Sequence, residues 1–231
     1  MTIDSKQLHE ALLTKAAHKM TRSYEYRFRK WLPKNRDAQI LDLGCGDEKI
    51  LWYLAQKYAE VSGVDLDLKK IESAKMLGVF VEHKEVLDFL THTHKTFDLI
   101  CALDLLEHLG KERIISFLEL CFKRLNSGGR IILQMPNPNS PFGYSVQQAD
   151  LTHEFTLSPV LALKILNEMG FVNTECRETG PPLWGYSPLA TMRFFVWRVI
   201  RLCYRFLNFI EAGEREDLPL TRVYLISACK K

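Results

Sequence analysis

The sequence predicts an α/β fold, in which helices cover both faces of a mostly parallel β-sheet. Short apolar runs of strand length alternate with longer segments whose apolar side chains recur at helical spacing. A chain of 231 residues, 47% of them apolar, is also long enough to bury one substantial core. These observations indicate one α/β domain with one or two additions to it.

The individual elements follow from this alternation in chain order. A helix is expected over residues 1–35, ended by Pro33, and we expect residues 1–36 to form a helical lid on a domain over 37–231. The predicted strands are 38–44, 61–67, 78–83, 96–103, 130–136, 171–178 and 221–230. The predicted helices between them are 47–59, 68–77, 111–125 and 158–169, with a turn at 126–129 and Gly170 closing the last of these helices.

Composition narrows the partners that the protein is expected to have. The net charge is +3, which is too small to indicate a nucleic-acid partner, and we expect none. The six cysteines have neither CxxC nor zinc-ligand spacing, so we expect reduced core thiols and no metal site. Residues 1–15 contain no apolar signal region, and no stretch of about 18 residues is both apolar and free of charge. We therefore expect a cytoplasmic protein.

Glycine and aspartate residues follow the first two strands, where a sheet of this kind binds its ligand. Asp42-Leu43-Gly44-Cys45-Gly46 ends the first strand, and its glycines allow a tight turn that brings the backbone close to a ligand. Asp65 ends the second strand about 20 residues further on, the offset at which an acid accepts hydrogen bonds from ribose hydroxyls. Asp67 is expected to cap the next helix instead.

Four segments together resemble the class I S-adenosylmethionine-dependent methyltransferases. ILDLGCGDEKILWYLAQKYAEVSGVDLD resembles the opening of that family, and VLDFL, FDLICALDLLEHL and LNSGGRIILQMPNP follow in its order and spacing. The similarity spans about residues 38–178 and implies a Rossmann-like, seven-stranded sheet with S-adenosyl-L-methionine as cofactor. A dehydrogenase is disfavoured, because the GxGxxG pattern would need glycine where Lys49 stands.

The resemblance implies cofactor contacts at the first two strands. Asp42 and the turn over residues 44–46 (Gly44, Cys45 and Gly46) would lie beneath the methionine part of the cofactor. Asp65 would hold the ribose, and Leu66 would pack on the adenine. The family often has a third glycine where this chain has Glu48, so that side chain must point away from the cofactor.

Further contacts are implied after the third and fourth strands. Asp88 would accept a hydrogen bond from the adenine amino group, with Leu87 or Phe89 beside it. Leu103 and Asp104 would close over the cofactor after the fourth strand.

Two histidines are candidates for the catalytic base. His108 follows the fourth strand and His153 follows the fifth, and an imidazole can take the proton of a hydroxyl acceptor near neutral pH. His108 could instead be a structural residue at the start of a helix. Asp150 or Glu154 is expected to orient His153. Asp150 and His153 could also chelate a metal, but two ligands do not make a site.

The segment DLTHEFT around His153 resembles methyltransferases of bacterial polysaccharide and lipopolysaccharide loci, and those that methylate hydroxyls of polyprenyl quinones. This resemblance implies O-methylation of a hydroxyl on a small-molecule, glycan or lipid-linked acceptor. Two other classes stay open at this point. One is a non-catalytic partner subunit with a methyltransferase-like fold, and the other is an adaptor that binds membrane surfaces.

A helical insertion is expected at about residues 179–218, before the last strand. Four of its polar side chains share a narrow face of this helix, and aromatic and aliphatic side chains occupy the opposite side. The polar side chains are Arg198, Arg201, Arg205 and Asn208. This pattern is typical of a helix at a membrane interface, so peripheral contact through 192–210 is expected, at the inner face of the membrane. Packing on the protein's own core, a homodimer contact, or arginines that face an acceptor phosphate remain alternatives.

Overall fold

The computed structural model describes residues 21–46, 49–76, 79–181, 187–213 and 218–231. Residues 1–20 of the helix predicted over 1–35, and the expected orientation of Glu48, lie outside this part of the chain. Residues 21–28 are helical and begin the described structure. The remaining elements are β1 (Gln39–Leu43), α2 (Lys49–Ala55), β2 (Glu60–Asp65), α3 (Leu68–Met76), β3 (Phe80–His83), α4 (Val86–His92), β4 (Phe97–Leu103), the short 3-10 helix η1 (Leu106–His108), α5 (Lys111–Arg124), β5 (Leu125–Pro136), α6 (Tyr144–Gln147), α7 (Pro159–Glu168), β6 (Phe171–Glu178), α8 (Pro188–Ala212) and β7 (Val223–Lys230).

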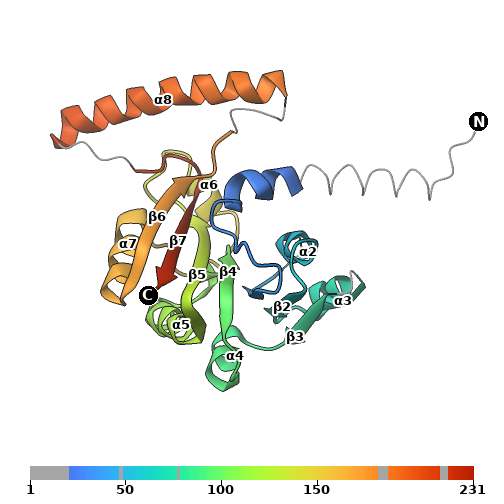
Figure 1. Cartoon of the computed structure of the whole chain (residues 1–231). Helices are drawn as coiled ribbons and strands as arrows, with labels where there is room; N and C mark the ends of the chain where they lie inside the picture. The colour runs from blue at the N-terminus through green and yellow to red at the C-terminus, as the bar shows by residue number, and fades with distance from the viewer. Residues whose placement is uncertain (1–20, 47–48, 77–78, 182–186, 214–217) are drawn as a thin grey trace, which may run out of the picture.

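The seven strands form one sheet in the order β3-β2-β1-β4-β5-β7-β6. Only β7 runs antiparallel to its neighbours, β5 and β6, so the predicted mostly parallel, seven-stranded sheet is confirmed. Figure 1 shows helices on both faces of this sheet and α8 lying across one of its ends. Strand order reverses between β1 and β4, and such a switch point places a ligand site at the carboxyl ends of these strands.

Apolar side chains alternate between the two faces of the sheet, and each face has its own core. Leu41 belongs to the core that α4, α5 and α7 cover, together with Phe117 of α5. Its neighbour Ile40 belongs to the core on the other face. This core is covered by α2, which contributes Tyr53, and by the segment after the first helix, which contributes Trp31. The sheet is therefore buried on both faces, as the continuous apolar runs predict.

Two predicted boundaries are wrong for identifiable reasons. The first helix ends at residue 28 rather than at Pro33, because the chain turns to bury Trp31, whose Nε1 donates a 2.7 Å hydrogen bond to Glu175 on β6. The predicted turn at 126–129 is part of β5, which begins at Leu125 and is irregular where its pairing with β4 shifts register. The helix α4 was not predicted from the sequence.

The insertion forms α8, a helix of 25 residues with no buried side chain. Within the described residues, no helix has both the length and the apolar character needed to cross a bilayer. Cys203 lies on α8 and is exposed, so the prediction of core thiols is wrong for this cysteine. The other five are buried or half-buried, and no disulfide joins any of the six.

Candidate active site

A cavity of about 930 Å³ opens at the carboxyl ends of β1, β2, β4 and β5. Its lining includes all but two of the predicted cofactor residues: Asp42, Gly44, Cys45, Gly46, Asp65, Leu66, Leu103 and Asp104. Tyr24 and Arg27, from the helix over residues 21–28, line it from the other side. Two residues of the predicted lid therefore contribute to the lining of the cavity.

The turn after β1 has glycine at its two left-handed positions. Gly44 and Gly46 both have left-handed backbone angles, with φ of 63° and 57°. A Cβ atom on Gly44 would stand 2.7 Å from Cδ1 of Leu105, far closer than carbon atoms approach. Because no side chains intervene at these two residues, the backbone itself faces the cavity.

Asp65 is fixed against this turn by two backbone amides. Its Oδ2 accepts a 2.7 Å hydrogen bond from the Gly46 amide, and its Oδ1 accepts one of 2.8 Å from the Asp67 amide. Each carboxylate oxygen keeps a further lone pair, so the group can still accept hydrogen bonds from two ribose hydroxyls. Oδ1 of Asp67 accepts from the Lys69 amide at the start of α3, which confirms that Asp67 caps this helix.

Two further acidic side chains line the cavity, and burial raises the pKa of both. Asp42 is 1% exposed, and its Oδ2 has no hydrogen-bond partner among the described residues. Burial raises the pKa of Asp42 well above its ordinary value, and the charge of Asp65 adds to this rise. Asp104 has a left-handed φ of 52° and accepts a 2.7 Å hydrogen bond from Gln134. A buried carboxylate oxygen without a partner is suited to a cationic ligand, and the sulfonium and ammonium groups of S-adenosyl-L-methionine are cationic.

Of Leu66, Leu87 and Asp88, the residues predicted to contact adenine, only Leu66 lines the cavity. Leu66 is 62% exposed at the edge of the cavity, where an adenine ring could cover it. Leu87 packs against the core instead, and the carboxylate of Asp88 lies 3.3 Å from Lys84 Nζ and 2.9 Å from His92 Nδ1. Neither Leu87 nor Asp88 is among the described residues that line the cavity, whereas Glu85 and Val86 are.

His108 is held by a chain of two hydrogen bonds. Its Nδ1 lies 2.8 Å from Oγ1 of Thr152, and Oγ1 in turn lies 2.7 Å from Oδ1 of Asp150. An ionised carboxylate can only accept, so the Thr152 hydroxyl donates to Asp150 and accepts from Nδ1–H of His108. The neutral ring therefore carries its lone pair on Nε2.

His153 has the same tautomer for a different reason. Its Nδ1 lies 3.1 Å from the carbonyl oxygen of Gln147, which can only accept, so the neutral ring again leaves Nε2 as the acceptor. The prediction that Asp150 or Glu154 orients His153 is not supported, because Gln147 is the partner of His153 and Asp150 acts on His108. The two imidazole rings meet edge to face, with centroids 4.8 Å apart.

Glu107, which the sequence analysis did not single out, completes this cluster. Glu107, His108 and His153 each bring one ligand atom to within 4.8 Å of the others, a spacing that could hold a metal ion. Glu107 is 2% exposed, and its Oε2 has no hydrogen-bond partner among the described residues. Burial raises the pKa of its carboxyl to about 8. The sequence prediction of no metal did not consider this carboxylate.

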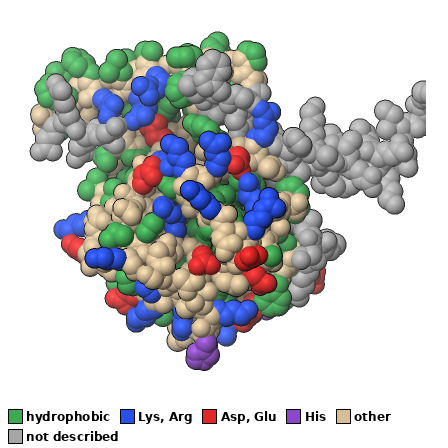
Figure 2. Space-filling view, viewed as in Figure 1, with side chains coloured by type: hydrophobic (Ala, Val, Ile, Leu, Met, Phe, Trp, Pro, Cys, Tyr) green, Lys and Arg blue, Asp and Glu red, His purple; other side chains and the backbone are tan. Residues whose placement is uncertain are grey.

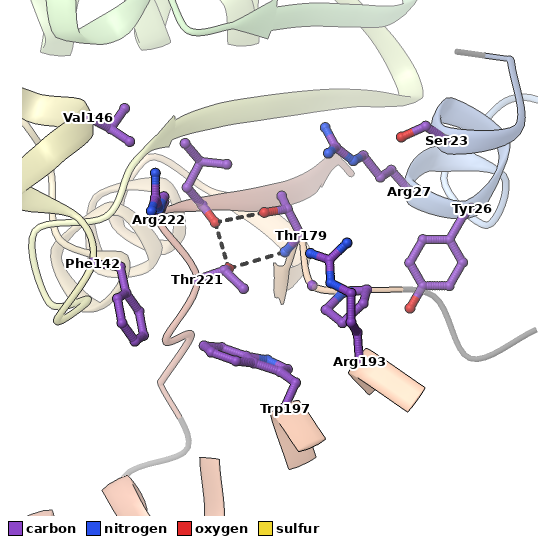
Figure 3. Close-up of a pocket in the computed structure, with 13 residues that line it drawn as sticks. Ser23, Tyr26, Arg27, Phe142, Val146, Thr179, Arg193, Trp197, Thr221 and Arg222 are labelled. Atoms are coloured by element: carbon purple, nitrogen blue, oxygen red, sulfur yellow. Dashed lines mark hydrogen bonds between the residues drawn. The ribbon is translucent and has the colours of Figure 1, made fainter. Parts of the chain in front are cut away.

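A second cavity, of about 590 Å³, lies between α8 and the domain. Figure 3 shows Arg27 and Arg193 on one side of it and the ring of Trp197 beneath, with Phe142 and Arg222 at the other end. Arg27 lines both cavities, so the second cavity adjoins the first.

The strand order, the glycine turn and the carboxylate at the end of β2 define an S-adenosylmethionine-dependent methyltransferase. A family model described as a methyltransferase domain matches residues 14–213, and the chain belongs to this family. The protein is therefore an enzyme that uses S-adenosyl-L-methionine as its cofactor.

Known proteins agree with this assignment. Over 153 residues the chain is 29% identical to the small RNA 2′-O-methyltransferase of Rattus norvegicus, an alignment that covers 58% of this chain and 38% of that protein. Over 112 residues it is 28% identical to the ubiquinone biosynthesis O-methyltransferase of Psychrobacter cryohalolentis, covering 44% of this chain and 42% of that protein. The chain thus spans less than half the length of these relatives.

A solved structure shows the same fold along most of the chain. The S-adenosylmethionine-dependent methyltransferase of Archaeoglobus fulgidus superposes with a TM-score of 0.68 at 24% identity, covering 91% of this chain and 94% of that one.

Proposed function

We propose that the protein transfers the methyl group to a hydroxyl oxygen, with His108 as the base. S-adenosyl-L-methionine, when bound, supplies an electrophilic methyl carbon, so the protein must position the acceptor and remove its proton. The observation that carries this proposal is the hydrogen-bond chain from His108 through Thr152 to Asp150, beside the cofactor cavity. His108 would take the proton on Nε2, and Asp150 would stabilise the resulting imidazolium through Thr152.

His153 was the other candidate for the base from the sequence, and it has a supporting role in this proposal. His108, Thr152 and Asp150 line the cofactor cavity, whereas His153 is not among the described residues of its lining. His153 packs edge to face on His108 and so fixes the orientation of that ring.

The names of the curated relatives support oxygen as the methylated atom. Both the small RNA 2′-O-methyltransferase and the ubiquinone biosynthesis O-methyltransferase methylate oxygen, as their names state. The acceptor of this chain could differ from both, because the alignments cover well under half of those proteins.

The second cavity supports an acceptor with a negative group and an apolar part. Arg27, Arg193 and Arg222 line it, and arginine is well suited to bind phosphate or carboxylate. Trp197 and Phe142 offer aromatic surface to a polyprenyl or acyl chain, or to the apolar face of a sugar. We therefore propose an anionic glycan or lipid-linked hydroxyl compound as the acceptor.

A second role for the histidine cluster is favoured by one observation. A carboxylate oxygen of the buried Glu107 and one ring nitrogen from each of two imidazoles lie within 4.8 Å of one another, a donor set that suits a divalent cation. A cation there would lower the pKa of an acceptor hydroxyl, in place of a histidine base. Dialysis against a chelator, followed by thermal-shift titration with Mn²⁺ alone, separates the two roles. A Mn²⁺-dependent stabilisation that Glu107→Gln abolishes supports the cation role, and its absence supports the histidine base.

The methylated atom can be identified without knowing the acceptor in advance. Purified protein is incubated with methyl-¹³C S-adenosyl-L-methionine and a protein-free bacterial extract, and the labelled products are examined by carbon NMR. We expect the label in methoxy resonances, and we expect the His108→Asn variant to produce at most a hundredth of that label. Label in N-methyl or C-methyl resonances would contradict the proposal.

A further inference from the structure

The side of α8 that faces away from the domain is apolar along its whole length. It carries Leu189, Met192, Phe195, Val196, Val199, Leu202, Phe206, Leu207, Phe209 and Ile210, which are 39–67% exposed. At about 100° per residue these side chains occupy a continuous sector of about 160° of the helix circumference. Their exposed surface is on the order of 1,000 Å², well above the largest apolar patch of an ordinary monomer. Figure 2 shows hydrophobic side chains along the outer edge of α8.

The opposite side of α8 is fixed to the domain, so the apolar side cannot simply turn inward. Nε1 of Trp197 donates a 3.0 Å hydrogen bond to Glu178 at the end of β6, and Nε of Arg201 lies 3.3 Å from the other oxygen of the same carboxylate. Phe142, in the loop after β5, packs against Trp197 and Tyr204.

Charged residues border the apolar sector rather than interrupt it. Arg198 and Arg205, seven residues apart, follow one border next to Phe209, and both are exposed. Arg193 and Glu211 follow the other border. Arg198 and Arg205 make one border of the sector positive, which is complementary to anionic lipid headgroups, whereas Arg193 on the other border points into the second cavity (Figure 3).

We propose that α8 lies in the surface of an anionic phospholipid bilayer, with its apolar sector inserted among the lipids and Arg198 and Arg205 at the headgroups. This proposal goes beyond the methyl transfer and does not depend on which atom is methylated. A second copy of the chain is the poorer occupant, because a helix pair buries a narrow stripe on each helix and would leave the flanks of this wide sector exposed. The sector also lacks the polar residues that set the register of a paired helix.

Membrane binding through the apolar sector of α8 would also place the second cavity close to the lipid. Arg193 and Trp197 belong to α8 and line this cavity from the side of the helix that faces the domain. A protein bound through α8 would therefore hold the cavity next to the lipid headgroups, and the first cavity adjoins it at Arg27.

Flotation of the full chain with vesicles tests the proposal. We expect binding to phosphatidylcholine vesicles that contain phosphatidylglycerol, and at least ten-fold weaker binding to phosphatidylcholine alone. Leu202→Glu combined with Phe206→Glu should weaken binding at least ten-fold. The matched control is Val160→Glu combined with Leu161→Glu on α7, where both side chains are also exposed, and it should bind as the unchanged protein does.

A second readout reports on the helix directly. Cys203 lies within the apolar sector and is the exposed one of the six cysteines, so an environment-sensitive fluorophore attached there should shift its emission when vesicles are added. A thermal shift with S-adenosyl-L-methionine shows that each variant is folded.

Three results would overturn the proposal. The first is unchanged flotation of the α8 variant, and the second is no binding of the unchanged protein to either vesicle. The third is a stable dimer in sedimentation that binds no vesicles and that the α8 substitutions disrupt, since a second copy would then be the occupant.

Discussion

The backbone amide of Gly46 donates a 2.7 Å hydrogen bond to Oδ2 of Asp65. This contact joins the turn after β1 to the carboxylate at the end of β2, the two features that the sequence marked as the cofactor site. It fixes the carboxylate before any ligand arrives, so little rotamer entropy remains to be lost when ribose hydroxyls bind.

We expect Gly44→Ala to damage both stability and cofactor binding. The new Cβ would lie 2.7 Å from Cδ1 of Leu105 in a residue whose φ is 63°, so the Leu105 side chain or the turn must move and the backbone is strained, at a cost of about 1–3 kcal/mol in the free energy of unfolding. Gly128→Ala is the matched control, because Gly128 has a φ of 77° and nothing within 4 Å of a new Cβ. Urea unfolding and calorimetry with the cofactor should show lost affinity only for Gly44→Ala, and equal affinities would contradict this account of the turn.

We expect substitutions in the hydrogen-bond chain on His108 to lower the methyl-transfer rate by different amounts, most for His108 itself. His108→Asn should lower the methyl-transfer rate by about 10²–10⁴-fold, because the base is lost. Thr152→Val keeps the base but disconnects Asp150, so a smaller loss of about ten-fold is expected. Formation of S-adenosylhomocysteine with the extract used above measures the rates, and cofactor affinity should be unchanged in both. A Thr152→Val loss as large as that of His108→Asn would argue against a relay.

The buried Glu107 should make stability depend on pH. Its carboxyl has a pKa of about 8 in the folded protein and ionises near 4.5 when unfolded. Between these values the folded state holds a proton that the unfolded state has lost, so the free energy of unfolding decreases as pH rises through this window. Glu107→Gln removes this titration. Its free energy of unfolding, relative to that of the unchanged protein, should therefore rise by up to roughly 4 kcal/mol between about pH 5 and pH 8.5.

The control for this experiment is Glu112→Gln, which makes the same substitution at an exposed position on α5. Urea unfolding at several pH values should show that the free energy of unfolding of Glu112→Gln differs from that of the unchanged protein by the same amount at each pH. A constant difference for Glu107→Gln as well would show that Glu107 is ionised in the folded protein throughout the range.

Glu178 should control how firmly α8 is attached. Its carboxylate accepts from Trp197, from the Leu220 amide at 2.8 Å, and faces Arg201. Glu178→Ala removes all three contacts, so we expect amide exchange in α8 to rise by about ten-fold or more, while β1 and β4 exchange as before. Hydrogen exchange followed by mass spectrometry measures this, and unchanged exchange in α8 would mean that other contacts hold the helix.

The sheet could be predicted from sequence because buried strands appear as local apolar runs. Residues 171–178 were predicted as a strand, and β6 has these bounds. The start of β5 was missed because Asn126 and the glycines after it are typical of turns, yet Asn126 donates its Nδ2–H to Asp98 on β4 and keeps the strand paired.

The site was predictable where one short segment carries it, as in the glycine turn and Asp65. It was not predictable where the contact joins distant segments. His108 and Thr152 are 44 residues apart, and only the fold brings Asp150 to His108 rather than to His153. Glu107 was missed because glutamate is seldom fully buried, and no local pattern announces the exception.

Calorimetric titration of S-adenosyl-L-methionine into the unchanged protein, Asp65→Ala and Asp67→Ala tests the cofactor site most directly. We expect binding to the unchanged protein, similar affinity for Asp67→Ala, and about 10–100-fold weaker binding to Asp65→Ala, which loses the carboxylate that accepts from the Gly46 amide and that we predict to hold the ribose. Equal affinity for Asp65→Ala, or no heat with the unchanged protein, would contradict the account.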